Sequence, residues 1–144
     1  MLPAAGAEGV PPELVFAIMR EESGFRPRAL SPVGARGLLQ LMPDTGARLA
    51  QELGMEPPAV DAFYEPSLNV RLGARLLGGL LRDFEGRLPA AIGGYNAGAA
   101  VVRRWLASRP GLADDEWVEA IPYDETRAYV RRVLRSLHAY QVLY

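Results

Sequence analysis

The sequence predicts an all-α fold for this chain of 144 residues. No segment alternates apolar and polar residues over the length that a half-buried strand needs. Apolar residues recur instead at the spacing of one helix face, most clearly from Leu68 to Phe84, where every fourth residue is leucine or phenylalanine. Prolines and glycines separate the periodic segments, as they do at helix starts and ends.

In the first half of the chain, prolines and glycines bound the predicted helices. Two prolines open the first helix, over residues 12–23, because its first turn tolerates a missing N–H, and Gly24 closes it. Turn-forming residues follow, and a short helical piece is expected around residues 35–42. A further proline starts a helix over residues 43–53. The proline-rich segment 55–65 is expected to be a connection.

The second half is predicted to contain five more helices, so that the domain has about seven to eight. The leucine-rich segment forms a long amphipathic helix of about 18 residues from Pro66. Helices over residues 90–96 and 101–106 are each followed by glycine or proline. Two aspartates start a short helix over residues 114–118, since acidic side chains complement the positive N-terminus of a helix. The last helix runs from about Tyr123 to the end.

Composition limits the classes of function. The net charge of −1 argues against a nucleic-acid partner, which would require a strongly basic surface. No window of about 18 apolar residues predicts a transmembrane segment. The chain has no cysteine and a single histidine, His138, which is expected to be packed or exposed on its helix; we therefore expect no metal and no cofactor. The sequence leaves the oligomeric state open, with a monomer expected.

One domain is the simplest organisation at this length. Residues 1–9 lack the basic and apolar regions of a signal peptide and are expected to form a flexible N-terminal tail. Residues 10–144 would then form the single folded domain.

Glu22 is the strongest candidate for chemistry. It continues the apolar face of the first predicted helix, which carries Leu14, Val15, Ile18 and Met19. Burial there would disfavour the charged form and raise the pKa of the Glu22 carboxyl, as a general acid requires. The alternative is a glutamate at a helix end that reaches water or pairs with an arginine.

Three further segments join Glu22-Ser23 in a recognisable order. They are Gly-Leu-Leu-Gln-Leu-Met-Pro at residues 37–43, Gly-Tyr-Asn-Ala-Gly at residues 94–98, and Ile121-Pro122-Tyr123 followed by Glu125-Thr126-Arg127 and Tyr129. Together the four segments resemble the soluble lytic transglycosylase family, lysozyme-like enzymes that cleave peptidoglycan. The resemblance covers residues 10–144 and implies a lysozyme-like catalytic domain around a glycan-binding groove, acting on peptidoglycan glycan strands in the bacterial cell envelope.

The resemblance also implies a mechanism with one carboxyl group. Glu22 would protonate the leaving oxygen between N-acetylmuramic acid and N-acetylglucosamine, and later act as base for the 6-hydroxyl that forms a 1,6-anhydro end. Ordinary glycosidases use a second carboxylate, and the sequence offers no convincing one. A hydrolytic lysozyme with the same site is the nearest alternative. A catalytically silent glycan-binding domain is another.

Supporting roles follow from the same resemblance. Ser31 and Tyr95 are expected to support the catalytic centre. The residues expected to bind substrate are Gly37, Gln40, Met42, Asn96, Glu125 and Tyr129. Gln40 offers amide donors and acceptors, and Met42 offers an apolar wall beside Glu22. The alternatives are a helix cap for Asn96, core packing for Met42 and Tyr129, and a solvated Glu125.

Two departures from the family pattern occur. Gly94 stands where the family commonly has alanine, and Glu21 stands where it often has glutamine. Successive helix positions differ by about 100°, so Glu21 and Glu22 cannot both face one cleft. Glu21 is expected to be solvated near an arginine. Arg127, Arg131 and Arg135, one helical turn apart, are expected to form a solvated stripe.

Overall fold

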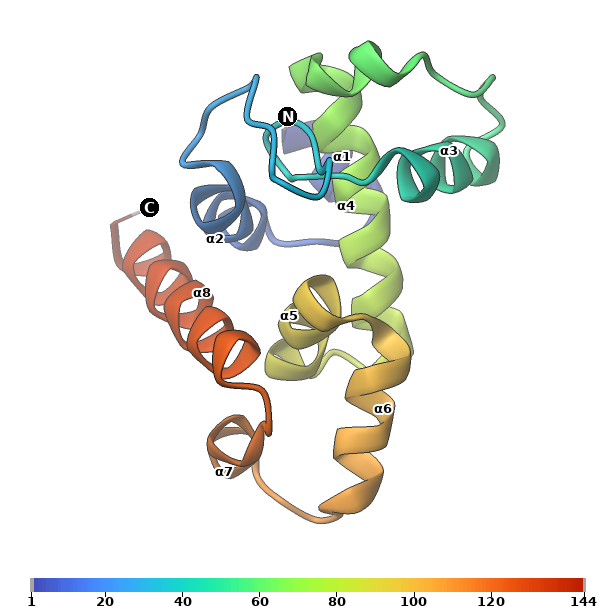
Figure 1. Ribbon diagram of the computed structural model, residues 1–144. Helices are drawn as coiled ribbons and strands as arrows, with labels where there is room; N and C mark the ends of the chain where they lie inside the picture. The colour runs from blue at the N-terminus through green and yellow to red at the C-terminus, as the bar shows by residue number, and fades with distance from the viewer. Residues whose placement is uncertain (1, 144) are drawn as a thin grey trace. The chain divides into compact units, whose positions relative to one another are not determined.

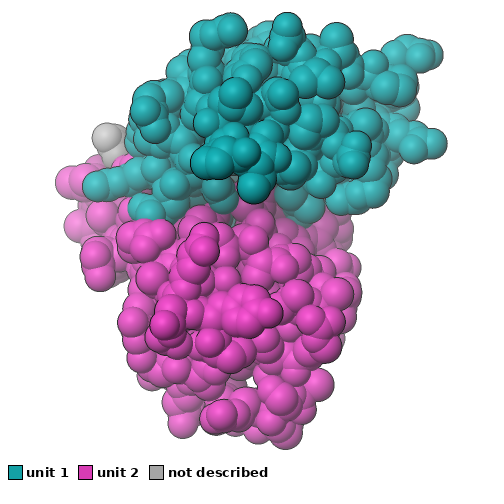
Figure 2. Space-filling model, in the orientation of Figure 1, with its two compact units in different colours: residues 1–76 teal, residues 77–144 magenta. Residues whose placement is uncertain are grey.

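The computed structural model describes residues 2–143, and within them the chain forms eight α-helices and one short 3₁₀ helix (Figure 1). The predicted all-α class is confirmed. The chain divides into two compact units, residues 1–76 and residues 77–144 (Figure 2). In order, the helices are α1 (Leu2–Ala7), α2 (Pro12–Ser23), α3 (Pro43–Glu52), η1 (Val60–Tyr64), α4 (Pro66–Asp83), α5 (Leu88–Ala97), α6 (Ala99–Ser108), α7 (Asp114–Ala120) and α8 (Asp124–Leu143).

Helices α2 and α4 confirm the helices that the prolines, glycines and leucine spacing of the sequence predict. Helix α2 begins at Pro12 and ends before Gly24, which adopts the left-handed conformation and donates its N–H to the Arg20 carbonyl oxygen at 3.0 Å. Helix α4 has 18 residues, as its leucine spacing predicts. No helix within the described residues is both long and apolar enough to cross a membrane.

The predicted tail is the first correction. Residues Leu2–Ala7 form α1, which packs on α2 and buries Ala5 to 1% exposure. The Val10 N–H donates to the Ala5 carbonyl oxygen at 2.9 Å, and Glu8 pairs with Arg75 at 3.6 Å. Met1 and Tyr144, the outer limits of the predicted tail and domain, lie outside the described residues. The single-domain boundary at residues 10–144 stays a prediction.

Residues 35–42 are the second correction, because they form a turn and no helix. The backbone of Arg36 makes antiparallel bridges to Leu30 and to Leu41. Between Arg36 and Leu41 the chain reverses direction through positive φ angles at Gly37 (+85°) and Gln40 (+50°). An α-helix contains no such angles. A short helix also occurs in the expected connection, where η1 turns Phe63 inward to 1% exposure.

The core of unit 1 joins α3, η1 and α4. Its buried members are Leu41, Leu49, Ala50, Phe63 and Leu72. Burial of each leucine or phenylalanine side chain in this set stabilises the fold by about 1.5–3 kcal/mol. This core places α4 beneath the turn at residues 36–41.

Asn69, the buried polar residue of α4, fixes that turn. Its Oδ1 accepts a hydrogen bond from the Leu39 N–H at 2.7 Å. Its Nδ2 donates to the carbonyl oxygens of Arg36 at 2.9 Å and Phe63 at 2.8 Å. With 0% exposure, this one side chain satisfies three backbone groups, two in the turn at residues 36–41 and one in η1.

Unit 2 is built around α5, which packs against α6 and α8, while α7 packs on α8. The residues of α5 from Pro89 to Gly94 are all buried. A side chain at Gly93 would meet Val102, Trp117 and Val130, so the surrounding helices close directly over the α5 backbone. Trp117 itself is 1% exposed and supplies the largest core side chain of α7.

Replacing Asn69 by alanine should lower the free energy of unfolding by about 2–4 kcal/mol, since buried donors and acceptors lose their partners. Chemical denaturation would measure this change. The matched control is Asn96→Ala, at an exposed asparagine with one hydrogen bond, where a loss of about 0.5–1.5 kcal/mol is expected. Equal losses in the two variants would contradict the role given to Asn69.

Candidate active site

A cavity of about 510 Å³ in unit 1 brings three of the predicted residues together. Glu22, Ser31 and Gln40 all lie on its wall. The other lining residues are Arg26, Arg28, Ala29 and Leu30. The helix end, the following loop and the turn at residues 36–41 therefore meet at one site.

Glu22 lies in the last turn of α2, on the face predicted for it. Ile18 and Met19, which precede it on that face, are 0% and 1% exposed, and Glu22 itself is half-buried. It is the single carboxylate among the lining residues, and Glu21 is not one of them. The structure thus separates the two adjacent glutamates as the helix geometry requires.

Ser31 and Gln40 both hold backbone in place. The Ser31 hydroxyl accepts the Ala35 N–H at 3.0 Å, which closes the loop that leads into the turn. The Nε2 of Gln40 donates to the carbonyl oxygens of Ala29 at 3.1 Å and Gly37 at 3.0 Å. These bonds leave the Oε1 of Gln40 as the acceptor through which this side chain can meet a ligand.

Gly37 and Met42 lie near the site but do not line this cavity. A Cβ at Gly37 would lie 2.3 Å from the Asn69 Nδ2 and 2.5 Å from the Phe63 carbonyl oxygen, so packing alone demands glycine there. Met42, the residue before α3, is 40% exposed. The alternative of core packing is wrong for Met42.

Arg26 and Arg28 are cavity residues that the sequence analysis missed. Both follow Glu22 within one short loop, and both are exposed. A pair of arginines flanking a proline directly after a candidate acid was the available signal. Two guanidinium groups favour the ionised form of a carboxyl beside them, opposite to the effect expected from an apolar wall at Met42.

The remaining predicted residues lie in unit 2, on α5 and α8. Tyr95 is half-buried and Asn96 is exposed. The Asn96 Oδ1 accepts a hydrogen bond from the Thr126 hydroxyl at 2.7 Å, which ties α5 to α8. Tyr129 is 4% exposed, which favours its packing alternative, and Glu125 is exposed in the first turn of α8.

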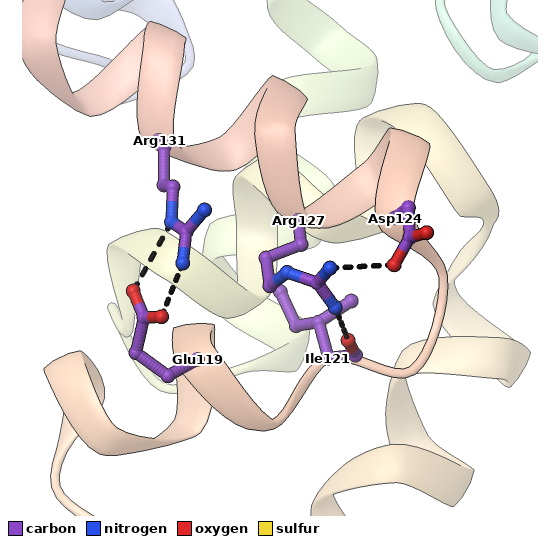
Figure 3. Close-up of polar contacts among 5 residues, drawn as sticks. All are labelled: Glu119, Ile121, Asp124, Arg127 and Arg131. Carbon is purple, nitrogen blue, oxygen red and sulfur yellow. Dashed lines mark hydrogen bonds and ion pairs between the residues drawn. The ribbon is translucent and has the colours of Figure 1, made fainter.

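The predicted solvated stripe of arginines is wrong at Arg127, which is partly buried, and holds at the exposed Arg131, although both side chains make the contacts drawn in Figure 3. Arg127 donates to the Ile121 carbonyl oxygen at 2.7 Å and pairs with Asp124. Arg131 pairs with Glu119 of α7 through two contacts. Arg135 is exposed as expected. These contacts fix the Ile121-Pro122-Tyr123 segment between α7 and α8.

Comparison with known proteins places this arrangement in a family. The model of the transglycosylase SLT domain family matches residues 2–118. This chain belongs to that family. The predicted family is thereby confirmed, and the match contains three of the four sequence segments; the fourth, at residues 121–129, lies beyond it.

Relatives agree at the level of sequence and structure. The chain is 36% identical over 129 residues to the soluble lytic murein transglycosylase of Escherichia coli K12, which covers 87% of this chain and 20% of that protein. It is 40% identical to the lytic transglycosylase Slt of Pseudomonas aeruginosa, solved as an inactive mutant, with a TM-score of 0.93 over 99% of this chain and 23% of that one. The chain thus spans about a fifth of these two relatives.

A third relative was solved with a ligand. It is a complex of the 70-kDa soluble lytic transglycosylase with bulgecin A, 32% identical to this chain, with a TM-score of 0.89. It covers 93% of this chain and 22% of that one.

Replacing Gly37 by alanine should destabilise the protein more than the same change at Gly34. Both glycines have positive φ, +85° and +96°, so each variant loses about 1–2 kcal/mol to backbone strain. Only at Gly37 does the new Cβ overlap neighbouring atoms, because at Gly34 the nearest is 3.6 Å away. We expect a further loss of about 1–3 kcal/mol at Gly37, measured by denaturant unfolding. A Gly34 variant at least as unstable would contradict this account.

Proposed function

We propose that this chain is the catalytic part of a peptidoglycan lytic transglycosylase, which cleaves the β-1,4 bond between N-acetylmuramic acid and N-acetylglucosamine without water. The observation that carries the proposal is Glu22, the single carboxylate on the cavity wall, with Ser31 and Gln40 beside it. Family membership and the named activity of the relatives support the same reaction.

The reaction needs one carboxyl group in two successive roles. Protonated Glu22 donates its proton to the glycosidic oxygen, and the bond from that oxygen to C1 of the muramic residue breaks. The acetamido oxygen of the same sugar attacks C1 and holds the positive charge. The Glu22 carboxylate then takes the proton of the 6-hydroxyl, whose oxygen attacks C1 and displaces the acetamido oxygen. Glu22 ends protonated, and the product carries a 1,6-anhydro ring.

The supporting residues divide by unit. In unit 1, Gln40 offers its Oε1 to a sugar hydroxyl or amide, Ser31 keeps the loop closed, and the exposed Met42 borders the glycan. Gly37, predicted to bind substrate, is buried and acts by letting the turn approach Asn69. In unit 2, Tyr95 has the supporting role in catalysis that the family resemblance implies. Asn96 on α5 and Glu125 on α8 are exposed and contact the glycan, whereas the buried Tyr129 packs in the core. The partner is the peptidoglycan glycan strand, which locates the activity in the bacterial cell envelope, and the active form is a monomer.

Product mass tests the proposal against its nearest alternative. A lysozyme with the same acid would let water attack C1, so its product would be heavier by one water molecule. Mass spectrometry of digested peptidoglycan should find anhydro ends. Reducing ends only would favour the lysozyme, and no cleavage at all would favour a silent binding domain. Bulgecin A, seen in complex with a relative, offers a binding probe that does not depend on turnover.

Replacing Glu22 by glutamine should reduce cleavage about 10²–10⁴-fold, because the amide cannot donate the required proton. The rate of anhydro-product release measures the loss. Glu21→Gln is the matched control, because it alters the adjacent residue, which does not line the cavity. If Glu21→Gln removes activity and Glu22→Gln keeps it, the acid has been assigned to the wrong residue.

Replacing Glu125 by glutamine should leave measurable turnover, because a one-carboxyl mechanism needs no second catalytic carboxylate. Asp44→Asn, Glu119→Gln and Asp124→Asn should behave in the same way. Glycan without its N-acetyl groups should instead be a very poor substrate, since the stabilising carbonyl oxygen is absent. A Glu125→Gln variant as inactive as Glu22→Gln would support a two-carboxylate hydrolase.

A further inference from the structure

The cavity wall beside Glu22 carries more positive charge than a neutral sugar chain requires. Two of its seven lining residues are arginines and one is a glutamate. Hydroxyl and acetamido groups of a glycan are uncharged, so Gln40 and backbone groups suffice to bind them. Guanidinium groups are the side chains that best match a carboxylate, through two parallel hydrogen bonds.

Both arginines are held in place by contacts that leave their outer N–H groups available. The Arg26 Nε donates to the Ser23 carbonyl oxygen at 2.9 Å, at the end of α2, where a cation is favourable. The Arg28 guanidinium carbon lies 4.9 Å from the centroid of the Tyr64 ring, within the range of a cation–π contact. Neither contact uses a carboxylate.

The backbone between the arginines is also fixed. The Ala29 N–H donates to the Arg26 carbonyl oxygen at 3.2 Å, which closes a turn with Pro27 at its second position. The Ala29 carbonyl oxygen accepts from the Gln40 side chain and from the Gly37 N–H at 2.9 Å. The two side chains therefore extend from one ordered turn. No ion pair joins either arginine to an acidic residue in the part of the chain that the structure describes.

We propose that Arg26 and Arg28 form a binding site for a carboxylate of the peptide attached to the glycan substrate, next to the candidate acid. The proposal rests on the proposed function for its substrate. A carboxylate ligand would account for the excess positive charge on the cavity wall. It would also explain how two cations can lie beside a general acid. A carboxylate bound between Arg26 and Arg28 offsets their positive charge. Glu22 is then protonated more readily when the correct substrate is present.

The test uses two peptide-bearing glycans that differ in one property. One has free peptide carboxylates, and in the other these carboxylates are amidated. Wild type should cleave the free-acid glycan with a kcat/KM about tenfold higher, as expected for two charge-assisted contacts. The R26Q/R28Q variant should lose this preference. The matched control R104Q/R135Q removes the same charge from two exposed arginines of unit 2 and should keep it.

Each outcome bears on the proposal. An unchanged preference in R26Q/R28Q, or no preference in wild type, overturns it. Loss of the preference in both double variants also overturns it, because net charge would then be the cause. If wild type cleaves neither glycan, the proposed function fails, and calorimetry of the free-acid and amidated peptide glycans still decides the site. Tighter binding of the free-acid form by about tenfold in wild type supports the site even if R26Q/R28Q does not fold.

Discussion

The three hydrogen bonds of Asn69 are the constraint on which the first unit depends. They join α4 to the turn at residues 36–41 and to η1, and they satisfy backbone groups that the core has removed from water. That turn carries Gln40, whose amide in turn holds the Ala29 carbonyl oxygen of the loop after α2. The order of the cavity wall therefore rests on a buried side chain that does not line the cavity. The turn comes so close to Asn69 that no side chain fits at position 37, so glycine is required there.

The distribution of acidic groups separates the proposed acid from the other carboxylates. Glu119 and Asp124 are each occupied by an arginine of α8, and these pairs shape the link between α7 and α8 (Figure 3). Glu22 stands instead at the end of an apolar helix face, on a cavity wall that also carries Arg26 and Arg28. Partial burial and neighbouring cations act in opposite directions on such a carboxyl. A substrate that offsets the charge of the arginines can therefore shift the Glu22 carboxyl toward its protonated form.

Much of the fold and part of the site could be predicted from sequence. Prolines and glycines locate α2 and α4 because their effects are local. Helix α1 was missed because its stability comes from burying Ala5 against α2, and residues 1–9 show no periodic stripe. The sequence pattern around residues 35–42 predicts a helix, but the chain forms a turn at residues 36–41 because its shape depends on Asn69, about 30 positions away from Leu39. Asn69 itself could have been found, since it lies on the apolar face of α4 with Leu72 and Leu76.

The central claim is that one carboxyl group cleaves the glycan without water, and the source of the oxygen at the new end tests it most directly. Peptidoglycan digested by the wild-type protein in water enriched in heavy oxygen should yield ends that contain none of the heavy isotope, because the 6-hydroxyl of the sugar supplies the attacking oxygen. One heavy oxygen incorporated per cleavage would contradict the account, since water would then have attacked C1.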